Sequence, residues 1–292
     1  MKIKKVFAEL VPSFDLGAQP EIMDRLAVIG RHFDDAEEMA RMTKKIYDKL
    51  GLELKDQEQV LLATLVHDIG KSGPADFVPE ERKDYVRMFP HAPVAVDKNT
   101  TVRDFLTLAK INNCGKIIDR LAETLRHPKN KAEREKAKSD LLEENIFVFW
   151  RRHVDFTYDV LKNNPAISQA VTEIASSHHI LEGKNPADLP WDEVPRAAII
   201  LEITDKYQAG RERINRDISP NKLTVHMLTV LDKYQAFRRR SALTHQETVK
   251  ILRIVVEKSN LEKNVKEEYQ KVIAYFENSE AELDEVINSV TA

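Results

Sequence analysis

The sequence predicts an all-α protein, and three observations support this prediction. The 292 residues include only eight glycines, few segments alternate polar and apolar residues, and many segments repeat apolar residues three and four positions apart. The last spacing places apolar side chains along one face of a helix. We therefore expect a helical bundle.

The periodic segments predict nine helices. These are residues 21–50, 56–68, 101–127, 131–163, 166–180, 194–211, 220–238, 244–259 and 262–290. Capping signals support several of these starts. Thr244 and Glu247 have the spacing of a capping box, and Ser219 precedes a proline at the first helical position. Residues 72–100 contain four prolines and no steady period, so we expect an irregular connection there.

Composition excludes several classes of function. The 45 basic and 48 acidic residues are interspersed and give a net charge of −3, so no surface for nucleic acid is expected. No apolar run approaches the roughly 18 residues of a membrane span. The N-terminal lysines are not followed by the apolar stretch of a secretory signal, so we expect a cytoplasmic protein. The single cysteine, Cys114, excludes an internal disulfide framework and a cysteine-rich zinc site.

Ionisable residues interrupt several apolar helix faces. The apolar run of residues 60–66 ends in His67 and Asp68, with Lys71 three residues further on. Other polar residues occupy equivalent positions on apolar faces or at the ends of apolar runs: His32, His153, His178, His179 and Asp205. Burying so many imidazoles and carboxylates requires either a dense hydrogen-bond network or metal ions. Nitrogen and oxygen ligands without thiolate suit iron, manganese, nickel, cobalt or zinc.

The number of these candidate ligands exceeds what one tetrahedral ion would use. Two ions that share a bridging carboxylate would fit the set. The sequence therefore predicts a binuclear metal site, with a buried hydrogen-bond network as the alternative.

The order of these residues resembles the motif of the HD superfamily of metal-dependent phosphohydrolases, which is a histidine, a His-Asp pair and a later aspartate. His32, the pair His67-Asp68 and Asp205 match that order. His153 and the pair His178-His179 are similar to the additional ligands of the HD-GYP branch, which acts on cyclic di-GMP and related cyclic dinucleotides. Further similar segments are HDIGK at 67–71, SSHHILEGKNP at 176–186 and ITDKYQAGRERINRDISP at 203–220, and the GYP element is degenerate.

The resemblance implies a helical bundle that binds two divalent metal ions, most often iron or manganese, with nickel, cobalt or zinc as alternatives. Asp68 would bridge the ions; His32, His67 and Asp205 would complete one site, and His153, His178 and His179 the other. A hydroxide held between the ions would attack phosphorus in line.

Four basic residues are candidates for substrate binding. Lys71 would stabilise charge on a phosphate oxygen, unless it is a solvent-facing lysine at a helix end. Lys184, Arg213 and Arg216 would bind the substrate; the alternative for the two arginines is a plain surface position.

The resemblance implies an HD-type domain over residues 1–240, with an enlarged helical insertion at about 72–150. Residues 241–292 are expected to form a C-terminal helical extension packed on the same domain. The insertion is a candidate for a lid or for a homodimer contact.

The expected function is hydrolysis of a phosphodiester in a nucleotide or cyclic dinucleotide. The substrate would thus be a small-molecule phosphate ester, and no partner nucleic acid or membrane is expected. One alternative is a nucleotide phosphomonoesterase, because the same chemistry serves both bond types. The other is a non-catalytic signalling or binding scaffold, which the degenerate GYP element favours.

Overall fold

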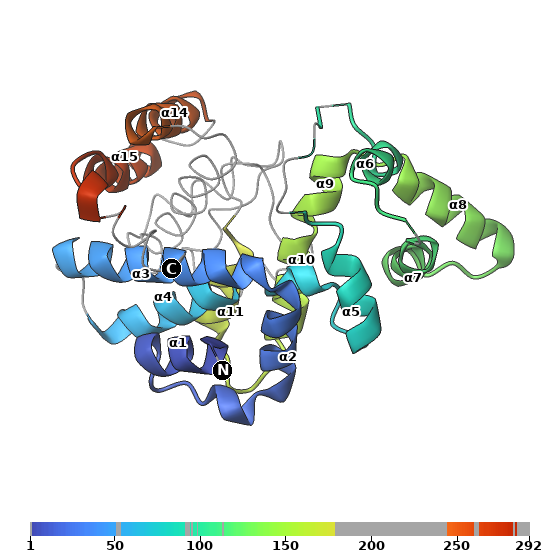
Figure 1. Cartoon of the computed structure of the whole chain (residues 1–292), viewed down its shortest axis with the longest axis horizontal. Coiled ribbons are helices and arrows are strands. Elements are labelled where there is room, and N and C mark those ends of the chain that lie inside the picture. The colour runs from blue at the N-terminus through green and yellow to red at the C-terminus, as the bar shows by residue number, and fades with distance from the viewer. Residues whose placement is uncertain are drawn as a thin grey trace.

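The protein is described here from a computed structural model, which describes residues 2–50, 54–90, 94, 96–97, 99–112, 114–178, 244–259, 263–282 and 284. The all-α prediction is confirmed, since this part of the chain forms helices and no strand (Figure 1). Its only extended pairing is an isolated bridge between Thr101 and Asn145. The expected helices at 194–211 and 220–238 lie outside the described residues.

The first part of the chain forms a layer of helices that carries the His-Asp pair. Its elements are α1 (Lys2–Leu10), the short 3-10 helix η1 (Leu16–Ala18), α2 (Pro20–Ile29), α3 (Arg31–Leu50), α4 (Leu54–Val66) and the 3-10 helix η2 (Ile69–Ser72). Then follow α5 (Pro79–Val86), α6 (Val102–Leu108), α7 (Gly115–Arg126), α8 (Lys131–Leu142), α9 (Ile146–Arg151), α10 (His153–Leu161) and α11 (Gln169–Ser176). The C-terminal helices are α14 (His245–Lys258) and α15 (Lys263–Glu277).

Three expected long helices are each divided. Gly30 adopts φ +55°, which ends α2 and separates it from α3. Lys110 adopts φ +52° between α6 and α7. The side chain of Asn145 accepts from the backbone N–H of Phe147 and so starts a new helix after α8. The predictions of single helices over 21–50, 101–127 and 131–163 were therefore wrong.

Other boundaries also differ from expectation. Residues 72–100 contain α5, which starts at Pro79, where the missing N–H costs nothing because it would have no partner within the helix. The amphipathic helix α1, whose Val6, Phe7 and Leu10 are buried, was not predicted. The expected helix over 56–68 ends at Val66, so His67 and Asp68 lie in the turn after it, and α11 ends two residues before His178. The expected helix over 244–259 is confirmed as α14.

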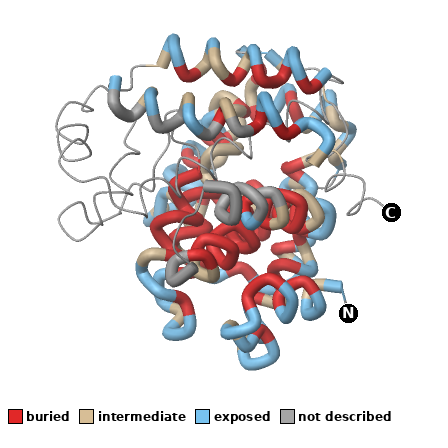
Figure 2. Tube along the Cα trace, turned by 90° about the vertical axis from the view of Figure 1, so that its left-hand side faces the viewer, coloured by how far each residue is buried: buried red, intermediate tan, exposed pale blue. Residues whose placement is uncertain are grey.

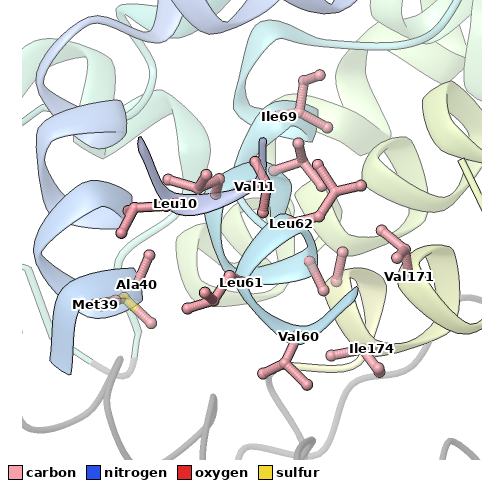
Figure 3. Packing of buried hydrophobic residues seen from close by; sticks show 14 of the residues in the cluster. Leu10, Val11, Met39, Ala40, Val60, Leu61, Leu62, Ile69, Val171 and Ile174 are labelled. Atoms are coloured by element: carbon pink, nitrogen blue, oxygen red, sulfur yellow. The ribbon is translucent and has the colours of Figure 1, made fainter. Parts of the chain in front are cut away.

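The main hydrophobic core lies between α1, α3, α4 and α11. Figure 3 shows Leu61 and Leu62 of α4 with their neighbours from other parts of the chain: Leu10 and Val11, Met39 and Ala40, and Val171 and Ile174. Buried residues of α14 and α15 belong to the same cluster: Val249, Leu252, Val256, Ile273 and Phe276. Figure 2 shows the buried residues concentrated inside the body, with exposed residues along its outer helices.

A second hydrophobic cluster forms within residues 77–156. Tyr85 of α5 is at its centre, with ring centroids 5.4–6.1 Å from those of Phe77, Phe89, Phe149 and Phe156. The buried apolar faces of α6, α7 and α8 complete this cluster. Figure 1 shows these three helices together on the side of the molecule away from α14 and α15. The segment expected to be an insertion thus has a core of its own.

None of the helices in the described ranges combines the length and the apolar character needed to cross a bilayer.

The fully buried Arg25 of α2 fixes the backbone that follows the His-Asp pair. Its Nε donates to Glu21 at 3.0 Å. Its two terminal nitrogens donate to four oxygens of the chain between η2 and α5: Ser72 Oγ, Gly73 O, Pro74 O and Ala75 O. Burial lowers the pKa of Arg25 to about 10, which still leaves the guanidinium charged at neutral pH. One buried side chain therefore donates hydrogen bonds to four consecutive residues, Ser72 to Ala75.

We predict that Arg25→Met lowers the free energy of unfolding by roughly 2–5 kcal/mol, because the buried oxygens of that loop lose their donor. Urea denaturation at pH 7 measures this change. Glu21→Gln is the control, since Glu21 is 59% exposed and its ion pair with Arg25 contributes about 1 kcal/mol or less. Equal stability of Arg25→Met and the wild type would contradict the assignment.

Glu173 of α11 is a second buried ionisable group, only 2% exposed. Burial raises the pKa of Glu173 to about 8, and the hydrogen bond from Gln169 lowers it only in part. At pH 7 the carboxyl group is therefore mostly protonated. A raised carboxyl pKa in the folded state makes a contribution to stability that is fully present below the unfolded pKa, here 4.5, and is lost as pH rises through about 8.

We therefore predict that Glu173→Gln gains stability relative to the wild type as pH rises from 5 to 8. The difference should grow by up to about 1.4 kcal/mol per pH unit, because one proton is released on unfolding in this window. Urea denaturation of both proteins at each pH gives the difference directly. A difference that does not change with pH would show that Glu173 ionises normally.

Candidate metal centre

Three helix ends converge on the His-Asp pair. His67 and Asp68 follow α4, His153 begins α10 directly after α9, and His178 follows α11. All four side chains are buried, with exposed fractions of 0–3%. Asp68 is the residue immediately before η2, and Lys71 lies on η2. Packing of α4 and η2 against α10 and α11 brings these distant parts of the sequence together.

Each of the three histidines makes the same backbone hydrogen bond. Nδ1 lies 2.7 Å from the carbonyl oxygen three residues earlier, which is Thr64 for His67, Trp150 for His153 and Ala175 for His178. These carbonyls belong to the last turn of a helix, where they have no partner within the helix. A carbonyl can only accept, so Nδ1 must donate in each ring. In the neutral imidazole, Nε2 then carries the lone pair.

The three Nε2 atoms all face the Asp68 carboxylate. Oδ1 lies 3.3 Å from Nε2 of His153 and 3.7 Å from Nε2 of His178. Oδ2 lies 3.6 Å from Nε2 of His67 and 2.5 Å from the Lys71 ammonium. The two oxygens of one carboxylate thus face different histidines.

The Nε2 atoms of His153 and His178 are only 2.9 Å apart. Two lone pairs at this distance repel each other, so a cation must lie between the rings: either a proton on one of the two nitrogens or a metal ion that both can bind. With Asp68 and His67 beside them, the donor set is three imidazole nitrogens and one carboxylate, which suits a transition metal. His67, Asp68 and His178 also offer ligand atoms that lie within 4.8 Å of one another. The residues present therefore fit a metal ion.

The electrostatics of Asp68 favour the ionised carboxylate. Its burial alone would raise the pKa, but Lys71, His67 and the hydrogen-bonding rings of His153 and His178 hold the pKa of Asp68 well below its usual range. Asp68 is therefore an anion at neutral pH, with the Lys71 ammonium beside it. This is the charge state that a metal ligand needs.

His32 is buried, and its ring contacts Phe89 of the second hydrophobic cluster. Its Nε2 donates to the Phe89 carbonyl at 3.0 Å, and its ring meets the Phe89 ring edge-on. Phe89 also packs against the His153 ring, with centroids 6.0 Å apart. A role for His32 as a ligand stays a prediction.

Five predicted residues lie outside the described part of the chain: His179, Lys184, Asp205, Arg213 and Arg216. Their predicted roles therefore stay predictions. Sequence reasoning also missed two residues that hold the site together, Gly70 and Thr157. The glycine inside HDIGK was a visible signal for close packing, whereas a threonine within an apolar helix face carries no such signal.

Comparison with known families gives one match. Residues 33–150 match the family model described as the HD domain. The matched segment includes His67 and Asp68, begins immediately after His32 and covers less than half of the chain. The match supports the resemblance to the HD superfamily. It also supports the interpretation of the protein as a metal-dependent hydrolase. Searches of curated proteins and of solved structures found no match.

Gly70 allows η2 to approach α10 closely. A Cβ atom at this position would lie 2.0 Å from the His153 carbonyl oxygen and 2.5 Å from the Thr157 nitrogen. Both neighbours are backbone atoms that cannot turn aside as a side chain can. Residue 70 must therefore lack a side chain if the turn of residues 67–71 (the His-Asp turn) is to contact the helix that carries His153.

We predict that Gly70→Ala moves the His-Asp turn away from α10 and lowers both thermal stability and metal binding. Calorimetry gives the melting temperature, and elemental analysis gives the bound metal. Gly115→Ala is the matched control, because a Cβ at Gly115 meets nothing within 4 Å and the substitution in a helix should add about 0.4–1 kcal/mol of stability. Similar behaviour of the two variants would contradict the close approach.

Proposed function

We propose that this protein is a metal-dependent phosphohydrolase whose metal centre is built on Asp68. The observation that carries the proposal is the convergence of three oriented Nε2 atoms on one buried carboxylate. Divalent ions in such a set act as Lewis acids and lower the pKa of a bound water toward neutrality. The HD-domain match over residues 33–150 supports the same chemistry.

The binuclear arrangement is part of the proposal. Asp68 Oδ2 faces His67, whereas Oδ1 faces His153 and His178, so the carboxylate divides the ligands into two groups. We assign His32 and Asp205 to the first group and His179 to the second, following the order of the HD motif. Iron or manganese is the expected pair of ions, because imidazole and carboxylate ligands without thiolate suit both.

Lys71 is proposed to bind the phosphate of the substrate. Its side chain is 12% exposed and its ammonium is 2.5 Å from Asp68, so it lies at the edge of the centre rather than in bulk solvent. An ammonium group there can bind a phosphate oxygen and stabilise the negative charge that develops during hydrolysis. Lys184, Arg213 and Arg216 are proposed to bind the rest of the substrate.

The proposed substrate class is a phosphodiester of a nucleotide or cyclic dinucleotide. The resemblance to the HD-GYP branch motivates this choice, and the degenerate GYP element keeps the nucleotide phosphomonoesterase as the second candidate. Hydrolysis of cyclic di-GMP, a linear dinucleotide and a nucleoside monophosphate under identical metal conditions separates the two. A non-catalytic scaffold would hydrolyse none of them while still binding one.

We predict that Asp68→Asn abolishes hydrolysis and removes most of the bound metal, because the neutral amide cannot bridge two cations. Wild-type protein purified without chelator and under nitrogen should contain about two equivalents of iron or manganese by elemental analysis. Asp140→Asn is the control, since Asp140 is an exposed carboxylate on α8. It should retain both metal and activity.

Two outcomes would overturn the proposal. Wild-type protein that binds no divalent metal, even after reconstitution, would indicate that the buried histidines form a hydrogen-bond network only. Metal that remains fully bound in Asp68→Asn would indicate a centre elsewhere in the chain.

A further inference from the structure

We propose that Thr157 is a positioning residue that sets the distance between the His-Asp turn and His153. This inference rests on the proposed metal centre, because it concerns the two segments that supply its ligands. Thr157 is fully buried, and it lies on α10 one helical turn after His153. No ligand role is assigned to Thr157 itself.

The hydroxyl of Thr157 bonds to both ends of the His-Asp turn. Oγ1 donates to the carbonyl oxygen of His67 at 2.9 Å. Oγ1 of Thr157 in turn accepts from the backbone N–H of Gly70 at 3.0 Å. The residues between these two points include Asp68. A single hydroxyl, acting as donor and acceptor, therefore ties the turn to the helix that carries His153.

This use of a helical threonine is unusual. A threonine within a helix commonly bonds the carbonyl oxygen four residues earlier in its own helix. Such a bond does not connect the helix to another element. Thr64, Thr172 and Thr248 of this chain make this kind of bond, with Oγ1 at 2.8–3.2 Å from their own helix carbonyls. Thr157 instead directs its hydroxyl across to η2. The two hydrogen bonds to His67 and Gly70 hold the hydroxyl in this direction.

Gly70 complements Thr157 from the other side of the contact. A Cβ at Gly70 would lie 2.7 Å from Oγ1 of Thr157, closer than the bond that the Gly70 nitrogen makes to it. The contact therefore requires a hydroxyl at position 157 of α10 and no side chain at position 70 of η2. Residues outside the ligand set can tune metal affinity by holding the ligands in place, and their loss commonly costs about 10–100-fold in affinity.

The test compares Thr157→Val, which keeps the shape and removes the hydroxyl, with Thr157→Ser, which keeps the hydroxyl. Mn²⁺ is titrated into the metal-depleted full-length chain by calorimetry. We expect Thr157→Val to weaken Mn²⁺ binding by about 10–100-fold and Thr157→Ser to stay within about 3-fold of the wild type. Thr248→Val is the matched control, because Thr248 is equally buried and its hydroxyl bonds the Thr244 carbonyl at the start of its own helix.

A second readout needs no metal. Amide hydrogen exchange of residues 67–72 should accelerate on the order of 10-fold in Thr157→Val and remain unchanged in Thr157→Ser and Thr248→Val. Should Thr157→Val fail to fold, Thr157→Ala removes the same hydroxyl without adding a methyl group and replaces it in both measurements.

The outcomes separate this inference from the proposed function. Unchanged exchange in Thr157→Val, or equal losses in Thr157→Val and Thr157→Ser, would overturn the positioning role. A wild type that binds no Mn²⁺ or other divalent ion would overturn the proposed function, while the exchange experiment would still decide whether Thr157 holds the turn.

Discussion

The candidate site depends on one repeated interaction, the hydrogen bond from a histidine Nδ1 to a backbone carbonyl in the last turn of a helix. It occurs at His67, His153 and His178, and it leaves Nε2 of each ring as the atom that faces Asp68. A helix end always has unpaired carbonyls, so the fold supplies these acceptors at no additional cost. This bond therefore fixes the tautomer and direction of a potential ligand.

The surrounding structure holds the turn between His67 and Lys71 in place through two contacts. Arg25 fixes the backbone that follows the turn. Thr157 ties it to α10, and Gly70 allows the approach. These contacts are buried and directional, so the turn has little freedom to move independently of the core. A site that must hold several ligands at fixed distances requires such support.

The helix α10 joins the two hydrophobic clusters. Its Phe156 belongs to the cluster around Tyr85, whereas Val160 and Leu161 belong to the main core. His153 and Thr157 are carried on the same helix, next to the turn that contains Asp68. Movement of the segment over residues 77–150 would therefore act on His153 through α10 and through Phe89, whose ring packs against it.

The sequence by itself determined the all-α class and singled out His67, Asp68, His153 and His178, which the fold brings together, because apolar periodicity and ionisable residues within it are local signals. It did not locate the helix breaks at Gly30 and Lys110, because the apolar spacing that predicted single helices continues across both positions. Nor could it identify Thr157 or Arg25, whose partners lie 90 and up to 50 residues away. Only the tertiary structure decided those pairings, because hydrogen bonds between distant segments leave no periodic trace in the chain.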